Sequence, residues 1–532
     1  MKNKKFQTYN LNMDKFEYDE TGIKDYFFPL NYKHLDNFRE KIMLEIKTFL
    51  NKDELTSRKY KECIRLFFKW FFKDILNFLY AVYLIEEYKK NNKEIYISSR
   101  EDFLYRINSN KVPQTPFEKL WAGPKKQNFV FKSLKKIIRQ FQFNNIKNLT
   151  KFDKKINIFH FASLIKENIK NEESKNYFHY EEDFFKKIDN KIPYFNNNNF
   201  SFNQKKNYLK LNKLLKSIFK ELNLPFPKIC RNYFFNWITQ GDLFLDFHEK
   251  NYKKVDGEVH ITSAGNTLWT KMLCKFSIDD KKKVVNYDHG SGGVLHDFLP
   301  RFFTDLSYIS EYVTHNEFHK SLIEKRHKDL NKFNLYDKKF LINFIQNKKN
   351  LFNLKPTKKI IKDKKLKILY VSTVYLGYET RFRPVIPNIM YFDFQIRLIN
   401  LLKEISSDIT IKPHPEGKYK TPVKNLNCKH IYTKFENIKD IDKYDLIITD
   451  HIASSTIKSM IFLDVPVFFI NYETPFIYAD AMEIIQKGFY VLKTFLDKDN
   501  RIMINKEELL FKINKLQKKD TKDKNFLRNL YT

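Results

Sequence analysis

The sequence predicts an α/β protein of two Rossmann-like domains that face each other across a cleft, with an α-helical N-terminal extension or insertion. Short β-branched and aromatic runs alternate with helical segments over residues 255–320, and the same rhythm resumes after residue 366. Such alternation is typical of parallel sheets covered by helices on both faces. A charged stretch, residues 327–365, lacks a sustained apolar face and separates the two runs as a linker.

These patterns divide the 532 residues into successive parts. The first part is polar and aromatic, and we expect it to lie over the domain that follows it. The predicted parts are an N-terminal extension (1–60), a first Rossmann-like domain (61–326) with a helical insertion (about 107–228), the linker (327–365), a second Rossmann-like domain (366–517) and a loose tail (518–532).

The elements of the first domain follow in order. A long helix ends near Lys90 and leads into a short strand, EIYISS. Helices are predicted within the insertion at 131–143, 159–171 and 208–222. After residue 255 the chain reads as strand GEVHITSAG, helix NTLWTKMLCKF, strand KKVVNY with a glycine loop, and a further strand and helix over 306–325.

The second domain repeats this rhythm more regularly. We predict a strand at 367–372, a helix at 388–405, strands DITIK, KHIYT and DLIIT, a helix SSTIKSMIFLD and a strand PVFFI. An amphipathic helix is expected at 505–517. In open parallel sheets ligands bind beyond the carboxyl ends of the strands, so the residues there are the candidates for function.

The net charge of +34 raises the question of an anionic partner. Of the 97 basic residues only 14 are Arg, and the Lys-rich stretches are also rich in Asn, Ile, Phe and Tyr, which is typical of a compositional bias. Proteins that read bases depend on the bidentate fork of Arg. The composition therefore disfavours a nucleic-acid partner, whereas a basic surface attracts phosphorylated metabolites and acidic lipid head groups.

Compartment signals point to a cytoplasmic protein. The four cysteines form no CxxC pair, which disfavours a disulfide scaffold or a zinc ribbon, and the polar N-terminus lacks the apolar run of a signal peptide. The most apolar stretch, 66–85, carries Lys69, Lys73 and Asn77 at four-residue spacing. One polar stripe on an apolar helix favours a buried helix with one wet edge over a membrane span, with an interfacial membrane helix as the alternative.

Two strand ends of the second domain carry groups suited to a phosphate. His414 follows DITIK and is held between prolines, in the run Pro413, His414, Pro415, Glu416 and Gly417. It could donate to a phosphate or serve as a structural turn residue. After DLIIT, Asp450 precedes a helix start whose hydroxyls could bind an anion or simply cap the helix: Ser454, Ser455 and Thr456.

A third candidate loop ends the strand KKVVNY in the first domain. Asp288 and His289 supply a carboxylate and an imidazole, either of which could take a proton from an acceptor hydroxyl. Three glycines allow a ligand to approach the backbone closely: Gly290, Gly292 and Gly293. Two further loops lie at strand ends: one contains Gly265 and Asn266, and the other contains Ser372 and Thr373. Two of the rare arginines, Arg381 and Arg383, follow the second loop.

Three stretches resemble GT-B-type bacterial glycosyltransferases of surface and capsule polysaccharides, including CDP-glycerol glycerophosphotransferases. They are YDHG (287–290), IKPHPEG (411–417) and IITDHIASSTIKSMIFLDVPVFFI (447–470). Sialyl- and Kdo-transferases also pair an HP motif with a later Ser-Ser or Ser-Thr motif. The resemblance covers residues 255–490, with His289 in place of the usual acid and two extra residues between Asp450 and Ser454.

The resemblance implies a transferase that moves a sugar or polyol phosphate from a CMP-, CDP- or UDP-linked donor to a surface polysaccharide or lipid-linked acceptor. His414 and residues 454–456 would bind the nucleotide phosphate, Asp288 or His289 would be the base, and the glycine loops would admit the acceptor. No cofactor or metal is expected, because the two Asp-x-Asp strings, 440–442 and 497–499, lie in polar turns. A peripheral contact with the anionic inner leaflet is expected.

Two other functions remain open from the sequence. A nucleotide-sugar epimerase could use the same cleft and would need no acceptor. A non-enzymatic basic protein that binds RNA or acidic lipid would explain the charge and leave the strand ends without a role.

Overall fold

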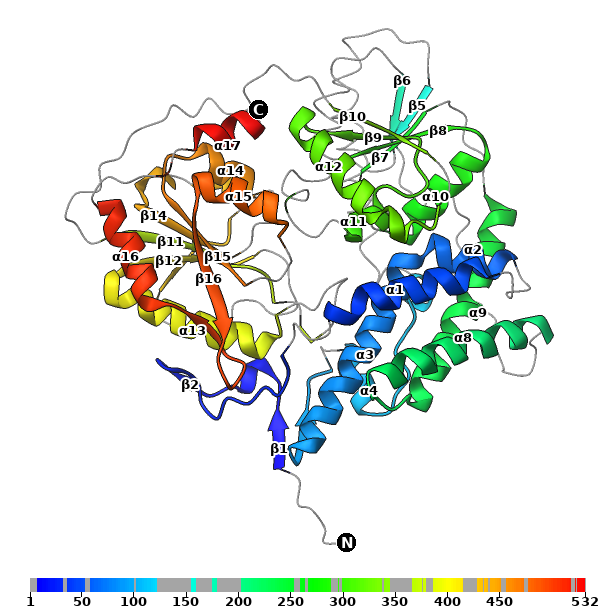
Figure 1. The fold of residues 1–532 in the computed structure, drawn as a ribbon, viewed down its shortest axis with the longest axis horizontal. Coiled ribbons are helices and arrows are strands. Elements are labelled where there is room, and N and C mark those ends of the chain that lie inside the picture. The colour runs from blue at the N-terminus through cyan, green and yellow to red at the C-terminus, as the bar shows by residue number, and fades with distance from the viewer. Residues whose placement is uncertain are drawn as a thin grey trace, which may run out of the picture.

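A computed structural model provides the structure of the chain (Figure 1). It describes residues 7–31, 36–52, 58–99, 102–121, 155–158, 175–178, 202–252, 259–263, 267–288, 295, 299–336, 339–344, 366–375, 377–378, 386–414, 428–433, 435–438, 441–450, 456–472, 477–517, 522 and 524–531.

The first domain is built on a six-stranded sheet in which every neighbouring pair is parallel. Its order is β10-β9-β8-β7-β5-β6. The strands are β5 (Lys155–Ile158), β6 (Lys175–Phe178), β7 (Val259–Ser263), β8 (Lys283–Tyr287), β9 (Glu311–Thr314) and β10 (Leu341–Phe344). Helices α10 (Leu268–Asp279), α11 (Leu299–Thr304) and α12 (Glu317–Leu330) connect them.

The second domain has a seven-stranded sheet of order β13-β12-β11-β14-β15-β16-β17, parallel except for the last pair. Its first six strands in chain order therefore follow the Rossmann arrangement 3-2-1-4-5-6. The strands are β11 (Lys367–Val371), β12 (Asp408–Lys412), β13 (Lys429–His430), β14 (Leu446–Thr449), β15 (Val467–Asn471), β16 (Tyr490–Leu496) and β17 (Ile502–Ile504). The helices are α13 (Asn388–Ile405), α14 (Thr456–Phe462), α15 (Ala479–Gly488), α16 (Lys506–Gln517) and α17 (Asn525–Tyr531).

A helical layer with an aromatic core packs against the first domain (Figure 1). Its helices are α1 (Asp36–Asn51), α2 (Arg58–Leu66), α3 (Phe68–Lys90), α4 (Asp102–Asn108), α5 (Pro116–Trp121), α8 (Phe202–Glu221) and α9 (Lys228–Asn251). Asp74, buried in α3, accepts hydrogen bonds from Tyr233 Oη (2.6 Å) and Trp237 Nε1 (3.1 Å). Most of α3 is buried, as expected for a core helix, although Asn77, expected on its wet edge, is buried as well. Among the described residues no helix is long and apolar enough to cross a membrane.

These observations confirm the predicted fold class: the chain is α/β, with two Rossmann-like parallel sheets and a substantial helical part at its N-terminal side. The predicted helix at 388–405 and the strand after it match α13 and β12. The predicted helix at 208–222 matches α8, whereas those at 131–143 and 159–171 lie outside the described residues.

Four local expectations differ from the structure. The expected insertion also contributes β5 and β6, and the expected linker contributes β10, because short strands in polar surroundings carry little periodicity. The expected loose tail contains α17, fixed by Lys524, which donates to the carbonyl oxygens of Met460, Leu463 and Val465. The strand EIYISS, β4 (Lys93–Tyr96), pairs with β1 (Gln7–Asn10) and not with the first sheet.

The N-terminal extension reaches the second domain rather than only the domain that follows it. After β1 it forms a small hairpin of β2 (Tyr18–Asp19) and β3 (Gly22–Ile23), and residues 11–28 pack against α13 and the β16–β17 turn. We call residues 11–28 the N-terminal strap. Because β1 pairs with β4 beside α3, the strap joins the helical layer to the second domain (Figure 1).

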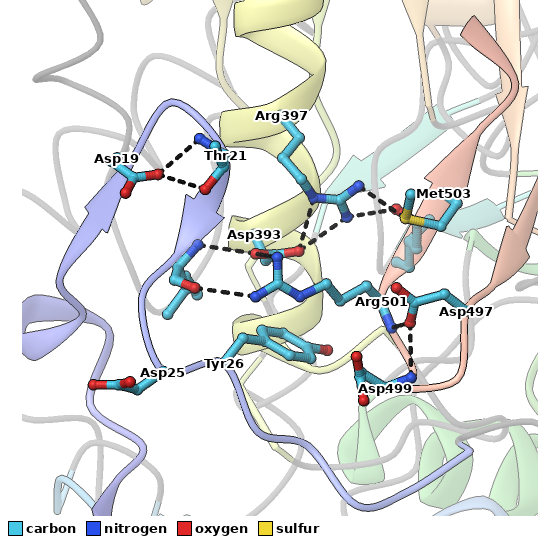
Figure 2. A network of polar contacts seen from close by, with 12 residues as sticks. Asp19, Thr21, Asp25, Tyr26, Asp393, Arg397, Asp497, Asp499, Arg501 and Met503 are labelled. Carbon is cyan, nitrogen blue, oxygen red and sulfur yellow. Dashed lines mark hydrogen bonds and ion pairs between the residues drawn. The ribbon is translucent and has the colours of Figure 1, made fainter.

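A buried carboxylate on α13 fastens this strap (Figure 2). Asp393 accepts a hydrogen bond from Ile23 N (2.9 Å) and pairs with Arg397 (2.9 Å) and Arg501 (3.6 Å). Arg501 stacks over the Tyr26 ring at 4.5 Å and donates to the Ile23 carbonyl oxygen (3.2 Å). One carboxylate thus holds three separate parts of the chain together.

Gly22 is required at the tip of the strap hairpin. Its φ is +118°, and a β-carbon there would meet Asp393 Oδ1 at less than van der Waals distance. We expect Gly22→Ala to lower the free energy of opening the strap by about 2 kcal/mol, since both backbone strain and a clash oppose the bound form. Amide hydrogen exchange at residues 23–26 should become roughly 30-fold faster.

The control is Lys24→Ala, which alters an exposed strap side chain and should change protection by less than about 0.5 kcal/mol. Equal protection in the two variants would contradict the anchoring role of Asp393.

Candidate functional site

The structure describes six of the predicted site residues: Asp288, Ser372, Thr373, His414, Asp450 and Thr456. Five of them lie at or within two residues of the carboxyl ends of strands, and Thr456 is the first residue of the helix that follows β14. The other predicted site residues lie outside the described residues: Gly265, Asn266, His289, Gly290, Gly292, Gly293, Pro415, Glu416, Gly417, Ser454 and Ser455.

The second sheet brings its candidates to a topological switch point. Strand order reverses between β11 and β14, which are parallel neighbours with Val371 opposite Thr449. Ser372 and Thr373 follow β11, Asp450 follows β14, and His414 follows the adjacent strand β12. In doubly wound sheets the crevice for a nucleotide lies at this reversal, because the loops on its two sides leave in opposite directions.

Asp450 occupies the base of this switch point and is enclosed by tyrosines. Its Oδ2 accepts hydrogen bonds from Tyr370 (2.5 Å), Tyr391 (2.8 Å) and Tyr472 (3.0 Å). Its Oδ1 accepts from Thr373 N (2.7 Å). With its carboxylate oxygens engaged from β11, α13 and the end of β15, Asp450 is suited to positioning the loop after β11 rather than to contacting a ligand.

Burial raises the pKa of Asp450 to about 6, although the three tyrosine hydroxyls and Thr373 N act in the opposite direction. A carboxylate loses more by leaving water than these neutral donors return. Keeping Asp450 ionised at this buried position therefore lowers the stability of the folded protein.

The loop after β11 has further anchors on α13. Gly377, with a φ of +87°, donates its N–H to Asn388 Oδ1 (2.9 Å), and Gln395 donates to the hydroxyls of Tyr370 (3.1 Å) and Tyr391 (2.8 Å). This network holds Ser372 and Thr373 in place at the strand end, as a preorganised binding loop requires.

The start of α14 is a weaker anion-binding site than the sequence suggested. Thr456 is its first residue, and the helix has only seven residues, about two turns. Few aligned peptide dipoles contribute at such an end, so an anion there would depend on direct hydrogen bonds. Lys458, in the first turn, adds a positive charge.

In the first domain, Asp288 continues β8 but is buried and paired. Its Oδ1 contacts Arg301 Nη1 on α11 at 2.5 Å, and its Oδ2 accepts a longer hydrogen bond from Thr314 at the end of β9 (3.4 Å). A guanidinium at this distance stabilises the ionised carboxylate, which weakens it as a proton acceptor. The geometry therefore favours an electrostatic role for Asp288.

His315 lies beside Asp288, directly after β9, and was not singled out from the sequence. Its Nε2 is buried and has no hydrogen-bond partner among the described residues. Burial lowers the pKa of His315 to about 4; Asp288 acts to raise it, while Lys458 and Arg301 act to lower it. Asn316, the next residue, donates a hydrogen bond to α17 of the second domain, so the end of β9 lies close to that domain.

Contacts at α12 and α17 join the two domains. Arg326 of α12 donates to both carboxylate oxygens of Asp480 on α15 and stacks on Tyr478 at 3.6 Å, and Lys325 pairs with the same carboxylate at 2.7 Å. Asn316 donates to the Leu530 carbonyl oxygen of α17 (2.6 Å).

Metal ligands are not assembled within the described part of the chain, where no group of three or more His, Cys, Asp or Glu side chains could hold an ion. The string 497–499 forms the β16–β17 turn, in which Asp497 Oδ1 accepts from the N–H groups of Asp499 (2.9 Å) and Arg501 (2.8 Å). The Asp497 carboxylate thus stabilises the turn through these hydrogen bonds.

Several residues that shape the site carried no usable sequence signal. Tyr370, Tyr391 and Tyr472 lie in or next to apolar elements and read as core, and Arg301 and His315 read as surface. Tyr370, Tyr472 and His315 lie at strand ends, which could have indicated a role, whereas Tyr391 and Arg301 lie in helices and meet their partners only in the fold.

Comparisons with known proteins show remote similarity only. No protein-family model matches the chain, and no curated protein matches it. Solved structures that resemble it include a UDP-N-acetylglucosamine 2-epimerase from Rickettsia bellii (12% identity, TM-score 0.33, 71% of this chain and 92% of that one) and MurG from Acinetobacter baumannii (10%, 0.31, 71% and 94%). A UDP-glucosyltransferase from Polygonum tinctorium is similar at 10% identity and TM-score 0.34, over 72% of this chain and 93% of that one.

The raised pKa of Asp450 predicts a specific dependence of stability on pH. Between about pH 4 and 6 the folded protein binds the proton that the unfolded chain has released, so stability falls as pH rises. The difference in unfolding free energy between wild type and Asp450→Asn should therefore fall by about 2 kcal/mol between pH 4 and 6 and level off near pH 7.

Urea unfolding followed from pH 4 to 7 measures this difference. Asp480→Asn is the matched control: burial raises the pKa of Asp480, but Arg326 and Lys325 outweigh it and lower this pKa to about 2, so its difference should rise by only about 0.3 kcal/mol above pH 4. A difference for Asp450→Asn that rises with pH would disprove the burial argument.

The buried pair of Asp288 and Arg301 predicts a large, coupled effect. Asp288→Asn leaves a buried guanidinium without its counter-charge and should cost about 3–5 kcal/mol of stability. The double variant Asp288→Asn with Arg301→Gln should cost clearly less than the two single changes added, because the unpaired charge is gone.

Thermal and urea unfolding of the wild type, the two single variants and the double variant give the coupling free energy between Asp288 and Arg301. Lys320→Ala, which breaks an exposed ion pair with Glu324 (3.8 Å), should cost less than about 0.5 kcal/mol. Additive losses at 288 and 301 would mean that the two side chains act independently.

Proposed function

We propose that the protein is a glycosyltransferase that moves a sugar or a polyol phosphate from a nucleotide-activated donor to a surface-polysaccharide or lipid-linked acceptor. The observation that carries this proposal is the placement of Ser372, Thr373, His414 and Asp450 around the switch point of a 3-2-1-4-5-6 sheet. This is the position at which doubly wound sheets bind nucleotides.

In the proposed reaction the second domain holds the leaving nucleotide. The half-buried His414 imidazole and the hydroxyls at 454–456 would donate hydrogen bonds to the phosphate, and Lys458 would add positive charge. Negative charge grows on the leaving phosphate as its bond to the transferred group breaks, so fixed donors there lower the barrier. Asp450 would position this machinery through Thr373 N without touching the ligand.

The first domain would activate the acceptor. Its hydroxyl oxygen attacks the transferred group while a base takes the proton. Because Arg301 stabilises ionised Asp288, we assign the proton to the imidazole of His289, the other candidate from the sequence. Asp288 would then act by electrostatics beside the imidazole.

Nucleotide binding tests the donor half of this proposal. A saturating nucleotide, at 100 times its Kd, stabilises the folded protein by about 2.7 kcal/mol, so CMP, CDP or UDP should raise the melting temperature, with GDP as a comparison. His414→Ala combined with Ser455→Ala should weaken binding by about 10- to 100-fold, since hydrogen bonds to a charged group are lost.

The matched control is Ser407→Ala, an exposed change at the amino end of the same strand β12, which should bind nucleotide like wild type. Unchanged binding in the double variant, or no stabilisation by any of the four nucleotides, would contradict the proposal. Conversion of a nucleotide sugar in the absence of any acceptor would identify an epimerase instead.

A further inference from the structure

Helix α8 carries an unusually one-sided charge. Among its 20 residues, FNQKKNYLKLNKLLKSIFKE, there are six lysines and a single acid, Glu221, at the last position. One face is apolar and buried, through Leu211, Leu215 and Phe219. The charges therefore lie on the remaining faces of a helix that is fixed to the helical layer along its length.

The exposed face of α8 forms a continuous stripe. Lys206, Leu209, Lys213, Lys216 and Lys220 are all exposed and recur at three- and four-residue spacing, which places them in one row along the helix. We call these five residues the lysine stripe. It spans about 21 Å, and α8 lies at the outer edge of the helical layer (Figure 1).

The charge of the lysine stripe is not neutralised by the described residues around it. None of its four lysines forms an ion pair within the described part of the chain. Glu221 is drawn away from the stripe by Lys41 on the neighbouring helix α1, at 2.9 Å. The surface therefore presents four uncompensated positive charges to solvent.

An apolar side chain is exposed among these charges: Leu209, within the stripe, is 63% exposed. Apolar groups among lysines suit the boundary between lipid head groups and acyl chains, where the charges meet phosphates and the apolar tips enter the bilayer.

We propose that the lysine stripe of α8 docks the protein on an anionic lipid bilayer. Single-stranded nucleic acid is the less suitable occupant, because its binding sites use aromatic rings and arginines for stacking, and the stripe contains neither. Each lysine near an anionic surface contributes about 1 kcal/mol, so four together strengthen binding roughly a thousandfold. This surface goes beyond the proposed transferase activity and does not depend on it.

Vesicle sedimentation tests the proposal. We compare vesicles of 30% phosphatidylglycerol in phosphatidylcholine with pure phosphatidylcholine at 0.1 M salt, using wild type and the quadruple variant Lys206→Gln, Lys213→Gln, Lys216→Gln and Lys220→Gln. Wild type should bind only the anionic vesicles, and the quadruple variant should bind them about 100- to 1000-fold more weakly. Leu209→Ser should weaken vesicle binding about tenfold.

The matched control neutralises four exposed lysines spread over other elements: Lys24, Lys403, Lys493 and Lys498, each to Gln. It makes the same change in net charge and should weaken binding less than tenfold. Equal losses in the two quadruple variants would show that net charge alone acts and would overturn the proposal. It would also be overturned if the stripe variant lost binding to a single-stranded RNA probe while keeping vesicle binding.

Nucleotide-dependent melting keeps the two proposals separate. The stripe variant should retain the wild-type melting temperature and the wild-type response to nucleotide, because the exposed face of α8 takes no part in the strand-end site. A failure of vesicle binding would thus leave the transferase proposal standing. A failure of nucleotide binding would likewise leave the membrane-docking proposal standing.

Discussion

The burial of α13 is the constraint on which the second domain depends. Twelve of its residues are buried, including Asn388, Asp393 and Gln395, so these polar side chains must find partners inside the protein. Asp393 finds them in Arg397, Arg501 and the strap, while Asn388 and Gln395 find them in the loop and tyrosines near Asp450. The helix therefore joins the N-terminal strap on one side to the candidate site on the other.

The cost of burying charge explains why these networks are so highly connected. Asp450 accepts four hydrogen bonds and still has a raised pKa, because neutral donors do not replace the water that an ionised carboxylate loses. Asp288 and Asp393 are stabilised differently, by guanidinium groups. All three carboxylates are buried, but Asp450 is surrounded by neutral donors, whereas Asp288 and Asp393 are ion-paired. Asp450 therefore serves to position its neighbours, and the other two form buried salt bridges.

The described contacts of α12 and the residue before it with the second domain are polar. Arg326 and Lys325 meet Asp480, Asn316 reaches α17, and Lys458 lies close enough to His315 to lower its pKa. Polar contacts of this kind hold domains less tightly than an apolar interface, so relative domain motion is expected. The strap, anchored to the helical layer at one end and to Asp393 at the other, limits that motion from the opposite side of the molecule.

Local pattern determined much of this protein by itself. Alternating strands and helices indicated the two parallel sheets, and α13, β12 and the strand ends at Asp288, His414 and Asp450 followed from periodicity, because a buried strand or helix repeats its apolar residues over a few positions. Only the tertiary structure decided what depends on distant pairs. No local sequence pattern encodes contacts between elements that meet only when the chain packs. Such contacts include the strand order that makes a switch point beside Asp450 and the ion pair of Asp288 with Arg301. They also include the approach of Lys458 to His315 and the course of the strap onto α13.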